Sequence, residues 1–409
     1  MDDFKLLTPN FSNECLLAGE IDTLFSSDID SVIKRERECF DKLAAPFEKS
    51  IVLFGSGQLG RKTLKGLRKI GIEPLAFADN NSKLWNQSVD GLTVLSPEDA
   101  AQTFGNKAVF VVTIWGACST HRLAHTREQL QLLNCLKIVS CTFLFWKYPE
   151  TFLPHYCLDL PHKVYQQAEN IKKAFSIWAD EQSRHEYLVQ LRWRMVLDFD
   201  SLSSPVSQEQ YFPQDIFTLS PTDVFVDCGA YNGDTIESFL KHQSSFLGRI
   251  IALEPDPNNF KKLQGYVDTL PKSLQEKVTI LPLAAAAQRK KLRFAATGTV
   301  SSVVTNTGKL EIDGVPLDEL LNDTVPTFIK MDIEGAELDA LLGTQKIIQN
   351  ASPILAICLY HCQDHLWRIP LLLKSLSSQY RFFLRPHGEE CWDLNCYAVP
   401  VTRLKPEFQ

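Results

Sequence analysis

The second half of the chain contains acidic residues and a glycine-rich turn whose spacing suits a nucleotide. Asp227 ends a short apolar run. A turn with Gly229 and Gly233 then leads into a helix that we expect to begin at Asp234. Glycines in such a turn let the backbone approach a ligand closely, and the first turn of a helix presents free N–H groups. Glu254 ends the next apolar run, 25 residues beyond Gly229, where a nucleotide-binding sheet places an acid on the ribose hydroxyls.

Two further segments are expected at the same edge of that sheet. The apolar run at 328–331 is followed by Asp332 and Glu334, and small residues at 284–287 would suit the flat surface of an adenine ring. Ligands of open α/β sheets bind at the carboxyl ends of the strands, so these segments should converge. Each has an ordinary explanation alone, because the turn could be a connection, Glu254 a solvated acid and Asp332 a helix cap. Their order along the chain favours a nucleotide site.

These segments resemble the FkbM-type S-adenosylmethionine-dependent methyltransferases. The matching stretches are Val226-Asp-Cys-Gly-Ala-Tyr-Asn-Gly-Asp-Thr, Ala252-Leu-Glu-Pro-Asp-Pro, Ile329-Lys-Met-Asp-Ile-Glu-Gly-Ala-Glu, Tyr360-His and Asp364-His-Leu-Trp-Arg-Ile-Pro-Leu. The resemblance covers residues 211–400, about half of the chain. It implies the sheet of a class I methyltransferase, S-adenosylmethionine as cofactor, and O-methylation of a hydroxyl on a sugar, nucleotide-sugar or natural-product acceptor.

The resemblance also implies a set of cofactor-binding residues. Some would hold the methionine end, an acid pair would take the ribose hydroxyls, and a small residue would line the adenine slot. In that order these are Asp227, Gly229 and Gly233, then Glu254 with Asp256, then Ala284. The remaining members of the expected cofactor set are Tyr231, Asp234 and Thr235. Asp332 would face the transferring methyl group or the acceptor.

A hydroxyl is a poor nucleophile until its proton moves, so we expect a base beside the methyl group. The candidates are Asp332, Glu334 and His361. We expect Asp332 to position the reactants and His361 to act as the base, because an unperturbed imidazole has a pKa of about 6.5. We assign Lys330 to packing or to a salt bridge.

No resident metal ion is predicted. A magnesium site remains open as an alternative, with the ligands Asp332, Glu334, His361 and His365. A zinc site would use Cys358, His361, Cys362 and His365. Zinc is disfavoured because Cys358 lies within the expected strand and the chain has no C-x-x-C pair.

A second glycine-rich loop lies near the N-terminus. The stretch Ile51-Val-Leu-Phe-Gly-Ser-Gly-Gln-Leu-Gly carries G-x-G-x-x-G at Gly55, Gly57 and Gly60, between an expected strand and an expected helix. Asp79 lies 19 residues beyond Gly60, an offset that suits an acid bound to a ribose. With Phe77-Ala-Asp-Asn and Leu95-Ser-Pro-Glu, this segment resembles the Rossmann-type modules of sugar-modifying enzymes. That resemblance implies a nucleotide or nucleotide-sugar ligand, and a structural domain without a ligand is the alternative.

Apolar runs alternate with amphipathic helices, which is typical of parallel α/β sheets. The expected strands of the first half are the four runs at 51–54, 74–78, 109–113 and 137–140. Those of the second half are the runs at 224–226, 250–253, 278–283, 328–331, 354–359, 381–384 and 396–399. We therefore expect an α/β protein. Its larger sheet would be class I methyltransferase-like and mostly parallel with an antiparallel edge strand, and a separate N-terminal Rossmann-like α/β domain would precede it. The expected parts are a helical segment at 1–48, the Rossmann-like domain at 49–150, a helical linker region at 151–210 and the methyltransferase domain at 211–409.

Composition narrows the classes of partner. The 409 residues carry a net charge of −7, with basic and acidic residues mixed throughout. A small-molecule hydroxyl acceptor is therefore expected, rather than nucleic acid or a membrane. Eleven cysteines without a C-x-x-C pair, and no apolar stretch near the ~20 residues of a membrane span, predict a cytoplasmic protein. The alternative functions are an NAD-dependent oxidoreductase, which would lack a Tyr-x-x-x-Lys pair here, and a non-enzymatic nucleotide sensor or scaffold.

Overall fold

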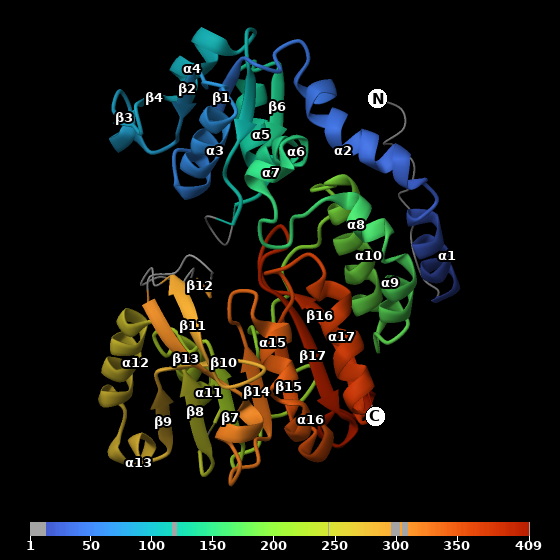
Figure 1. Ribbon diagram of the computed structural model, residues 1–409, viewed down its shortest axis with the longest axis vertical. Helices are drawn as coiled ribbons and strands as arrows, with labels where there is room; N and C mark the ends of the chain where they lie inside the picture. The colour runs from blue at the N-terminus through green and yellow to red at the C-terminus, as the bar shows by residue number, and fades with distance from the viewer. Residues whose placement is uncertain (1–13, 117–120, 244, 296–302, 305–309, 409) are drawn as a thin grey trace.

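The computed structural model describes residues 14–116, 121–243, 245–295, 303–304 and 310–408. Two α/β lobes follow one another along the long axis, each built around its own sheet, and a group of helices lies beside their junction (Figure 1). The expected α/β class is confirmed, with mostly parallel sheets in both lobes.

The first lobe contains a six-stranded sheet in the order β3-β4-β2-β1-β5-β6. All strands run parallel except β3, which pairs antiparallel with β4. The strands are β1 (Ile51–Phe54), β2 (Ala76–Ala78), β3 (Ser88–Val89), β4 (Leu92–Leu95), β5 (Val109–Val112) and β6 (Lys137–Ser140). The helices are α2 (Ile29–Ala44), α3 (Gln58–Lys69), α4 (Pro97–Phe104), α5 (Leu123–Leu132), α6 (Cys141–Lys147) and α7 (Pro149–Phe152). The four expected apolar runs all form strands, and the short β3–β4 hairpin is an addition that the sequence did not predict.

The second lobe contains a seven-stranded sheet in the order β16-β17-β15-β14-β7-β8-β9. Its strands are β7 (Val224–Cys228), β8 (Arg249–Leu253), β9 (Val278–Leu281), β14 (Phe328–Met331), β15 (Ile354–Cys358), β16 (Tyr380–Pro386) and β17 (Leu394–Pro400). The expected antiparallel strand is β17, which lies between β15 and β16 and is therefore one position in from the edge. The helices are α11 (Asp234–Lys241), α12 (Pro257–Thr269), α13 (Lys272–Gln275), α14 (Leu317–Leu320), α15 (Glu337–Leu342), α16 (Gln345–Ala351) and α17 (His365–Leu376).

A third, four-stranded sheet corrects one detail of the sequence analysis. The run at 278–283 was expected as a single strand, but it divides into β9 and β10 (Leu283–Ala285). Pro282 separates the two, because proline has no N–H to donate to a sheet. β10 belongs to a sheet of order β10-β13-β11-β12, with β11 (Lys290–Ala295), β12 (Val303–Val304) and β13 (Leu310–Val315).

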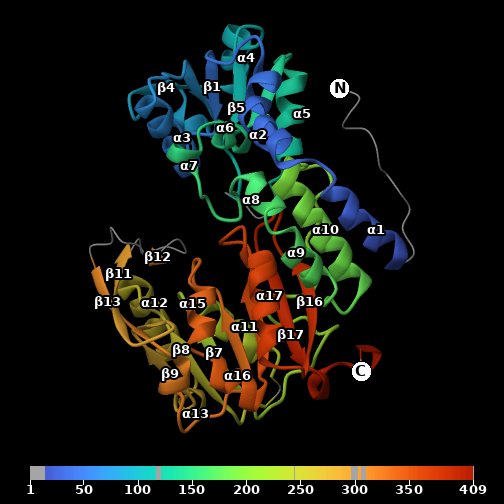
Figure 2. The same cartoon turned by 45° about the vertical axis from the view of Figure 1, so that its right-hand side comes forward.

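Helix α10 (Glu181–Val196) ties the two lobes together. Its Tyr187 and Leu191 belong to the hydrophobic core of the second lobe, whereas Val189 and Trp193 belong to that of the first. The other helices of this group are α1 (Glu14–Leu24), α8 (Pro161–Tyr165) and α9 (Ala168–Phe175). They lie on one side of the lobe junction in both views (Figures 1 and 2). The region expected as a helical linker therefore contributes to both cores.

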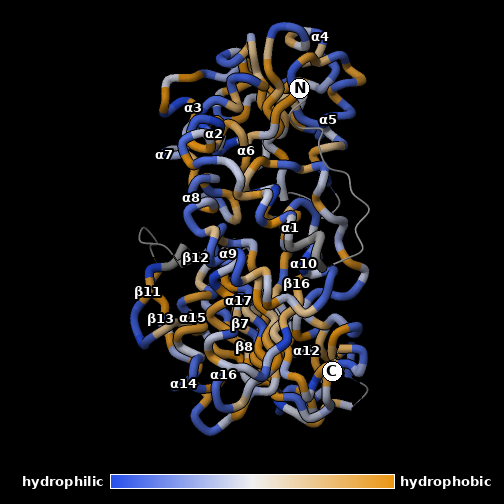
Figure 3. Tube along the Cα trace, turned by 90° about the vertical axis from the view of Figure 1, so that its right-hand side faces the viewer, coloured by the Kyte–Doolittle hydropathy of each residue, from blue (hydrophilic) through white to orange (hydrophobic). Residues whose placement is uncertain are grey.

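Hydrophobic residues gather along the strands of both lobes, and hydrophilic residues predominate toward the outside (Figure 3). β1, β5, β14 and β15 are buried along their whole length, which explains why their residues, apart from Lys330 of β14, are apolar without alternation. None of the described helices is both long enough and apolar enough to cross a membrane.

Candidate active site

One cavity of about 1040 Å³, here called the central cavity, lies between the two main sheets. It is lined by residues at or just beyond the carboxyl ends of strands from both lobes. Those from the first lobe are Gly55, Gly57, Asp79 and Thr113. Those from the second lobe are Gly229, Tyr231, Asp234, Thr235, Glu254, Ala284, Asp332 and Glu334. The fold thus brings most of the expected cofactor residues, and residues of the N-terminal loop, to one space.

A buried ion pair fixes the end of β7 against β14. The Lys330 ammonium lies 3.0 Å from Asp227 Oδ1, and both side chains are almost fully buried. It also donates to the carbonyl oxygen of Gly229 at 2.7 Å. Burial would lower the pKa of Lys330, but the carboxylates of Asp227 and Asp332 outweigh it and raise that pKa. Lys330 therefore forms the expected salt bridge. Asp227 is fully buried and contacts the turn indirectly, through Lys330, which binds the carbonyl oxygen of Gly229.

The turn after β7 requires its glycine. Gly229 has φ of +82°, and a Cβ at this position would lie 2.0 Å from the carbonyl oxygen of Asp332. The absence of a side chain therefore allows β7 and β14 to end side by side. Gly233 also has a positive φ, +93°, and a Cβ there would lie 2.4 Å from the Tyr266 ring. Gly233 begins α11 but does not appear in the cavity wall.

Glu254 accepts two backbone hydrogen bonds at the end of β8. Its Oε2 accepts from the N–H of Tyr231 at 2.8 Å, and its Oε1 accepts from the N–H of Asp256 at 2.8 Å. Burial raises the pKa of Glu254 to about 7 despite these donors. The expected neighbour, Asp256, is not brought to the cavity: it is buried and caps α12 by accepting from the N–H groups of Asn258 and Asn259.

Asp332 is held by two hydroxyl donors and one ion pair, which come from distant parts of the chain. Its Oδ2 accepts from the Tyr211 hydroxyl at 2.7 Å, and its Oδ1 accepts from the Tyr360 hydroxyl at 3.3 Å. His361 Nε2 lies 3.3 Å from the same Oδ1. A carboxylate with this many partners is fixed in orientation, and the positioning role of Asp332 stays a prediction.

The structure argues against His361 as the base. Its Nδ1 lies 2.7 Å from Glu337 Oε1, and its Nε2 faces Asp332. Burial would lower the pKa of His361, but Glu337, then Asp332 and Glu334, raise it to about 10. The imidazole is therefore protonated at neutral pH and has no lone pair to accept a proton. Glu337, fully buried, keeps a pKa well below its usual range because the His361 cation outweighs burial.

Glu334 has the properties that His361 lacks. Burial raises its pKa to about 7, with a further rise from Asp332 and a decrease from His361. Its Oε1 lies 4.0 Å from His361 Nε2. The backbone φ of Glu334 is +56°, a left-handed conformation that costs energy for a residue with a Cβ. Such strain is often kept where a side chain must point at a ligand.

The geometry of the site bears on the magnesium and zinc alternatives. Among the described residues, the one group able to supply three ligand atoms within 4.8 Å of one another is Asp332, Glu337 and His361. Ion pairing already occupies this group, because the two nitrogens of His361 face opposite carboxylates. Cys358 instead accepts from the Asn395 amide at 3.5 Å. Within the described ranges of the chain, the four ligands that a zinc site would use do not converge, in agreement with the argument against zinc.

The N-terminal loop is built like the loop after β7. Asp79 Oδ2 accepts from the N–H of Ser56 at 2.7 Å, and its Oδ1 accepts from the N–H of Asn81 at 2.8 Å. Glu254 makes the equivalent pair of contacts in the second lobe. Gly55 has φ of +106°, and a Cβ on Gly60 would lie 2.0 Å from the carbonyl oxygen of Gly55, whereas a Cβ on Gly57 would meet no atom within 4 Å. The open space at Gly57 faces the central cavity.

Sequence reasoning missed Tyr211, Tyr360 and Glu337. Tyr360 was quoted only as part of a motif, and its position just after β15 was the available signal. Tyr211 lies in a loop 121 residues before its partner Asp332, and no local pattern marks it. Glu337 begins α15, where an acid would ordinarily be explained by the helix dipole.

Fold and site together define an α/β methyltransferase-like domain, with acids at the carboxyl ends of neighbouring parallel strands. Residues 227–389 match the family model described as the methyltransferase FkbM domain. These residues are therefore similar to the FkbM methyltransferase domain, and the resemblance is confirmed for them. The expected ligand-binding module at the N-terminus remains a prediction.

Solved structures extend the likeness in fold. The methyltransferase FkbM of Methylobacillus flagellatus KT aligns with a TM-score of 0.76 and 20% identity, over 93% of this chain and 100% of that chain. Both lobes therefore have a counterpart there. A precorrin-6y C5,15-methyltransferase of Geobacter metallireducens GS-15 aligns with a TM-score of 0.29 and 13% identity, over 44% of this chain and 82% of that chain. No curated protein matches the sequence significantly.

Proposed function

We propose that this protein is an S-adenosylmethionine-dependent methyltransferase that methylates a hydroxyl of a sugar, nucleotide-sugar or natural-product acceptor. The observation that supports this proposal most is the common placement of three features. The Gly229 turn, Glu254 and Asp332 follow the neighbouring strands β7, β8 and β14, and all three line the central cavity.

The residues and the charge of the cavity wall suit the cofactor. Gly229, Tyr231 and Thr235 would hold the methionine end, Glu254 the ribose and Ala284 the adenine. The carboxylates that line this half of the cavity suit a cation, since unlike charges attract strongly where water is excluded. When bound, S-adenosylmethionine supplies a methyl group on a positively charged sulfur. The protein then has mainly to align the acceptor with that group.

Glu334 is the proposed general base. A pKa of about 7 leaves its carboxylate partly ionised at neutral pH, and it is basic enough to take a proton when the hydroxyl oxygen bonds to the methyl carbon. Asp332, fixed by Tyr211, Tyr360 and His361, would orient the hydroxyl. The His361 cation would pair with Asp332, so the proposed role of His361 is positioning.

Calorimetric titration with S-adenosylhomocysteine tests the cofactor site without any acceptor. We expect binding by the unaltered protein and a loss of at least about tenfold in affinity for Glu254→Gln, which keeps the shape of the side chain but not its charge. Glu276→Gln is the matched control, because Glu276 is exposed and outside the cavity wall. A folded, unaltered protein that does not bind S-adenosylhomocysteine would refute the proposal.

A second proposal concerns the N-terminal loop. The equivalent contacts of Asp79 and Glu254 support nucleotide binding there as well, on the side of the central cavity opposite Asp332. Titration with NAD and with uridine diphosphate glucose should show binding that Asp79→Asn weakens. NAD binding with redox turnover would favour the oxidoreductase instead, and binding of neither probe would favour a purely structural first lobe.

A further inference from the structure

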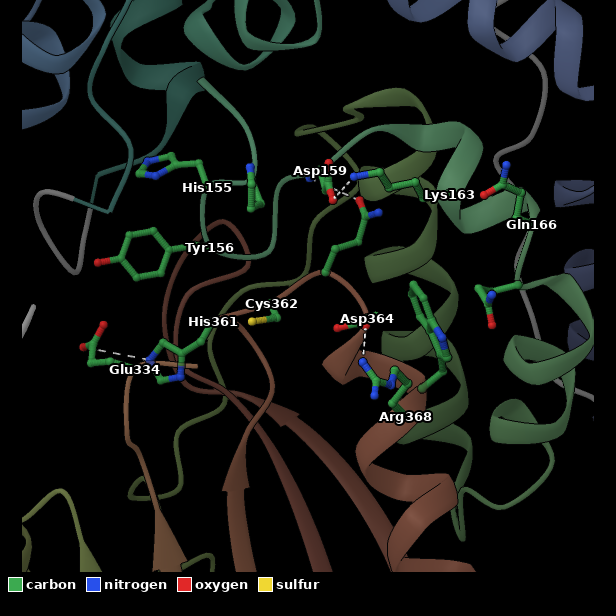
Figure 4. A pocket seen from close by; sticks show the side chains of 14 residues that line it. His155, Tyr156, Asp159, Lys163, Gln166, Glu334, His361, Cys362, Asp364 and Arg368 are labelled. Atoms are coloured by element: carbon green, nitrogen blue, oxygen red, sulfur yellow. Dashed lines mark hydrogen bonds and ion pairs between the residues drawn. The ribbon is translucent and has the colours of Figure 1, made fainter. Parts of the chain in front are cut away.

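A second cavity of about 780 Å³, here called the side cavity, lies next to Glu334 and His361 (Figure 4). One wall comes from residues 154–167, which connect the first lobe to α9, and the other from the loop after β15 and the start of α17. His155, Tyr156 and Glu334 line both this cavity and the central one. The volume falls within the about 300–1,000 Å³ of small-molecule sites.

The residues at this junction are held in costly conformations. Tyr156 has φ of +51° and Glu334 has φ of +56°, so both are left-handed although both carry a Cβ. The His361 side chain is only 1% exposed, and its Nε2 lies 4.0 Å from Glu334 Oε1. The carboxylate of Glu334 is 18% exposed and can be reached from either cavity. A ligand in the side cavity would therefore meet the proposed base from the side opposite the Gly229 turn.

Each cation that lines the side cavity already has a carboxylate partner, and the His361 cation has those of Glu337 and Asp332. Lys163 Nζ lies 2.7 Å from Asp159 Oδ2, and Arg368 Nη1 lies 2.7 Å from Asp364 Oδ2. Burial, reinforced by the charge of Lys62, lowers the pKa of His155 to about 3, so this imidazole is neutral. A phosphate group in this cavity would meet cations that already have anionic partners, beside an additional carboxylate from Glu334.

The remaining polar groups suit hydroxyls, which both donate and accept. The amides of Gln166, Gln167 and Gln363 line the cavity and offer a carbonyl and an NH₂ each. Gln363 is fixed, because its Oε1 accepts from the N–H of Asp159 at 3.2 Å and its Nε2 donates to the carbonyl oxygen of Leu160 at 3.3 Å. Trp367 also lines the cavity while only 2% exposed, and its indole N–H has no acceptor among the residues that the structure describes.

From these features we infer that the side cavity is the acceptor site and that it takes an uncharged polyhydroxylated molecule, such as a glycoside. This inference rests on the proposed methyltransferase function and narrows its acceptor class. A nucleotide-sugar would bring phosphate charge that the side cavity does not neutralise. An apolar scaffold would cover the amides of Gln166 and Gln167 without offering them hydrogen bonds. The acceptor hydroxyl reaches Glu334 and Asp332 across the junction, and its proton passes to Glu334.

Saturation-transfer NMR in the presence of S-adenosylhomocysteine tests the ligand class. The probes are methyl glycosides of glucose, galactose and mannose, with glucose 1-phosphate as the anionic probe and cyclohexanol as the apolar one. We expect signals from at least one methyl glycoside and weaker binding of the other two classes. Tighter binding of glucose 1-phosphate, binding of cyclohexanol alone, or no glycoside signal would each overturn the inference. This comparison uses the unaltered protein and needs no variant.

Two tryptophan variants locate the binding. Gln166→Trp would fill the side cavity from an exposed position and should lower glycoside affinity at least about tenfold. Gln131→Trp is the matched control on the exposed face of α5, outside both cavities, and should change nothing. An unchanged affinity in Gln166→Trp would place the glycoside elsewhere and refute the assignment.

The failure of this inference can be told from failure of the proposed function. Retained S-adenosylhomocysteine binding without glycoside binding refutes only the acceptor assignment. Loss of S-adenosylhomocysteine binding in the unaltered, folded protein refutes the methyltransferase proposal, and the acceptor role of the side cavity falls with it.

Discussion

The affinity for S-adenosylhomocysteine should rise with pH because of one carboxyl group. Glu254 has a pKa of about 7 in the free protein, since burial outweighs the two N–H donors that favour its ionised form. Ribose hydroxyls donate to a carboxylate more strongly than to a carboxylic acid. Ligand binding is therefore expected to select the ionised form, which means that the protein releases a proton when it binds.

The size of the effect follows from that pKa. With a pKa of about 7, roughly one molecule in ten is ionised at pH 6 and nine in ten at pH 8, so the affinity should rise about tenfold between these values. At pH 7 about half a proton should be released for each ligand bound. Calorimetry in buffers of different ionisation enthalpy measures both quantities.

The variant Glu254→Gln separates this group from others that titrate nearby. It should bind more weakly than the unaltered protein at pH 8 and should lose most of the pH dependence. An affinity for S-adenosylhomocysteine that is constant from pH 6 to pH 8 would refute the reasoning. So would a variant with the same slope as the unaltered protein, because the titrating group would then lie elsewhere.

Three further predictions concern Glu334, Lys330 and His361. Glu334→Gln should lower kcat by about 10²–10⁴, and the rate should no longer rise as the pH increases through about 7. A pH profile like that of the unaltered protein would show that another group is the base. Lys330→Met should lower the free energy of unfolding by about 3–5 kcal/mol, because it leaves the Asp227 carboxylate buried without a partner. Adding Asp227→Asn should restore most of this free energy. If urea unfolding shows no such recovery, the ion-pair explanation is contradicted. The raised pKa of His361 contributes stability that is complete below pH 6.5 and is lost as the pH rises through about 10. His361→Gln should therefore reduce the fall in the free energy of unfolding between pH 7 and pH 10. If urea unfolding gives the same dependence of this free energy on pH for both proteins, His361 makes no such contribution.

Local patterns predicted most of the elements that carry the site. The apolar runs before Gly55 and Gly229 form β1 and β7, and each is followed by a glycine with positive φ. These features are legible because strand burial and turn geometry constrain the residues of the segment itself. Pro282 was equally visible in the sequence, but the continuous apolar run at 278–283 was interpreted as one strand.

The partners of the reactive groups were not predictable in the same way. His361 was expected to be a base from its intrinsic pKa, but its protonation depends on Glu337, Asp332 and Glu334, which the fold packs around it. Asp256 was expected in the cofactor site because the resemblance places it beside Glu254, yet its side chain caps α12. A pKa is set by the neighbours of a group in space, and sequence proximity to a motif does not fix where a side chain points.

The sequence by itself determined the α/β class and the order of the strand and turn motifs, because these depend on periodicity and on residue types within short segments. The motifs also carried the resemblance to the FkbM methyltransferases, which the family model matches over residues 227–389. The tertiary structure alone decided that the glycine loops of both lobes face one cavity and that Glu334 lies where it meets a second one. It also brought Tyr211 to Asp332 across 121 residues. Such contacts join segments whose separation in the chain carries no local signal, and they form only when the sheets and α10 pack together.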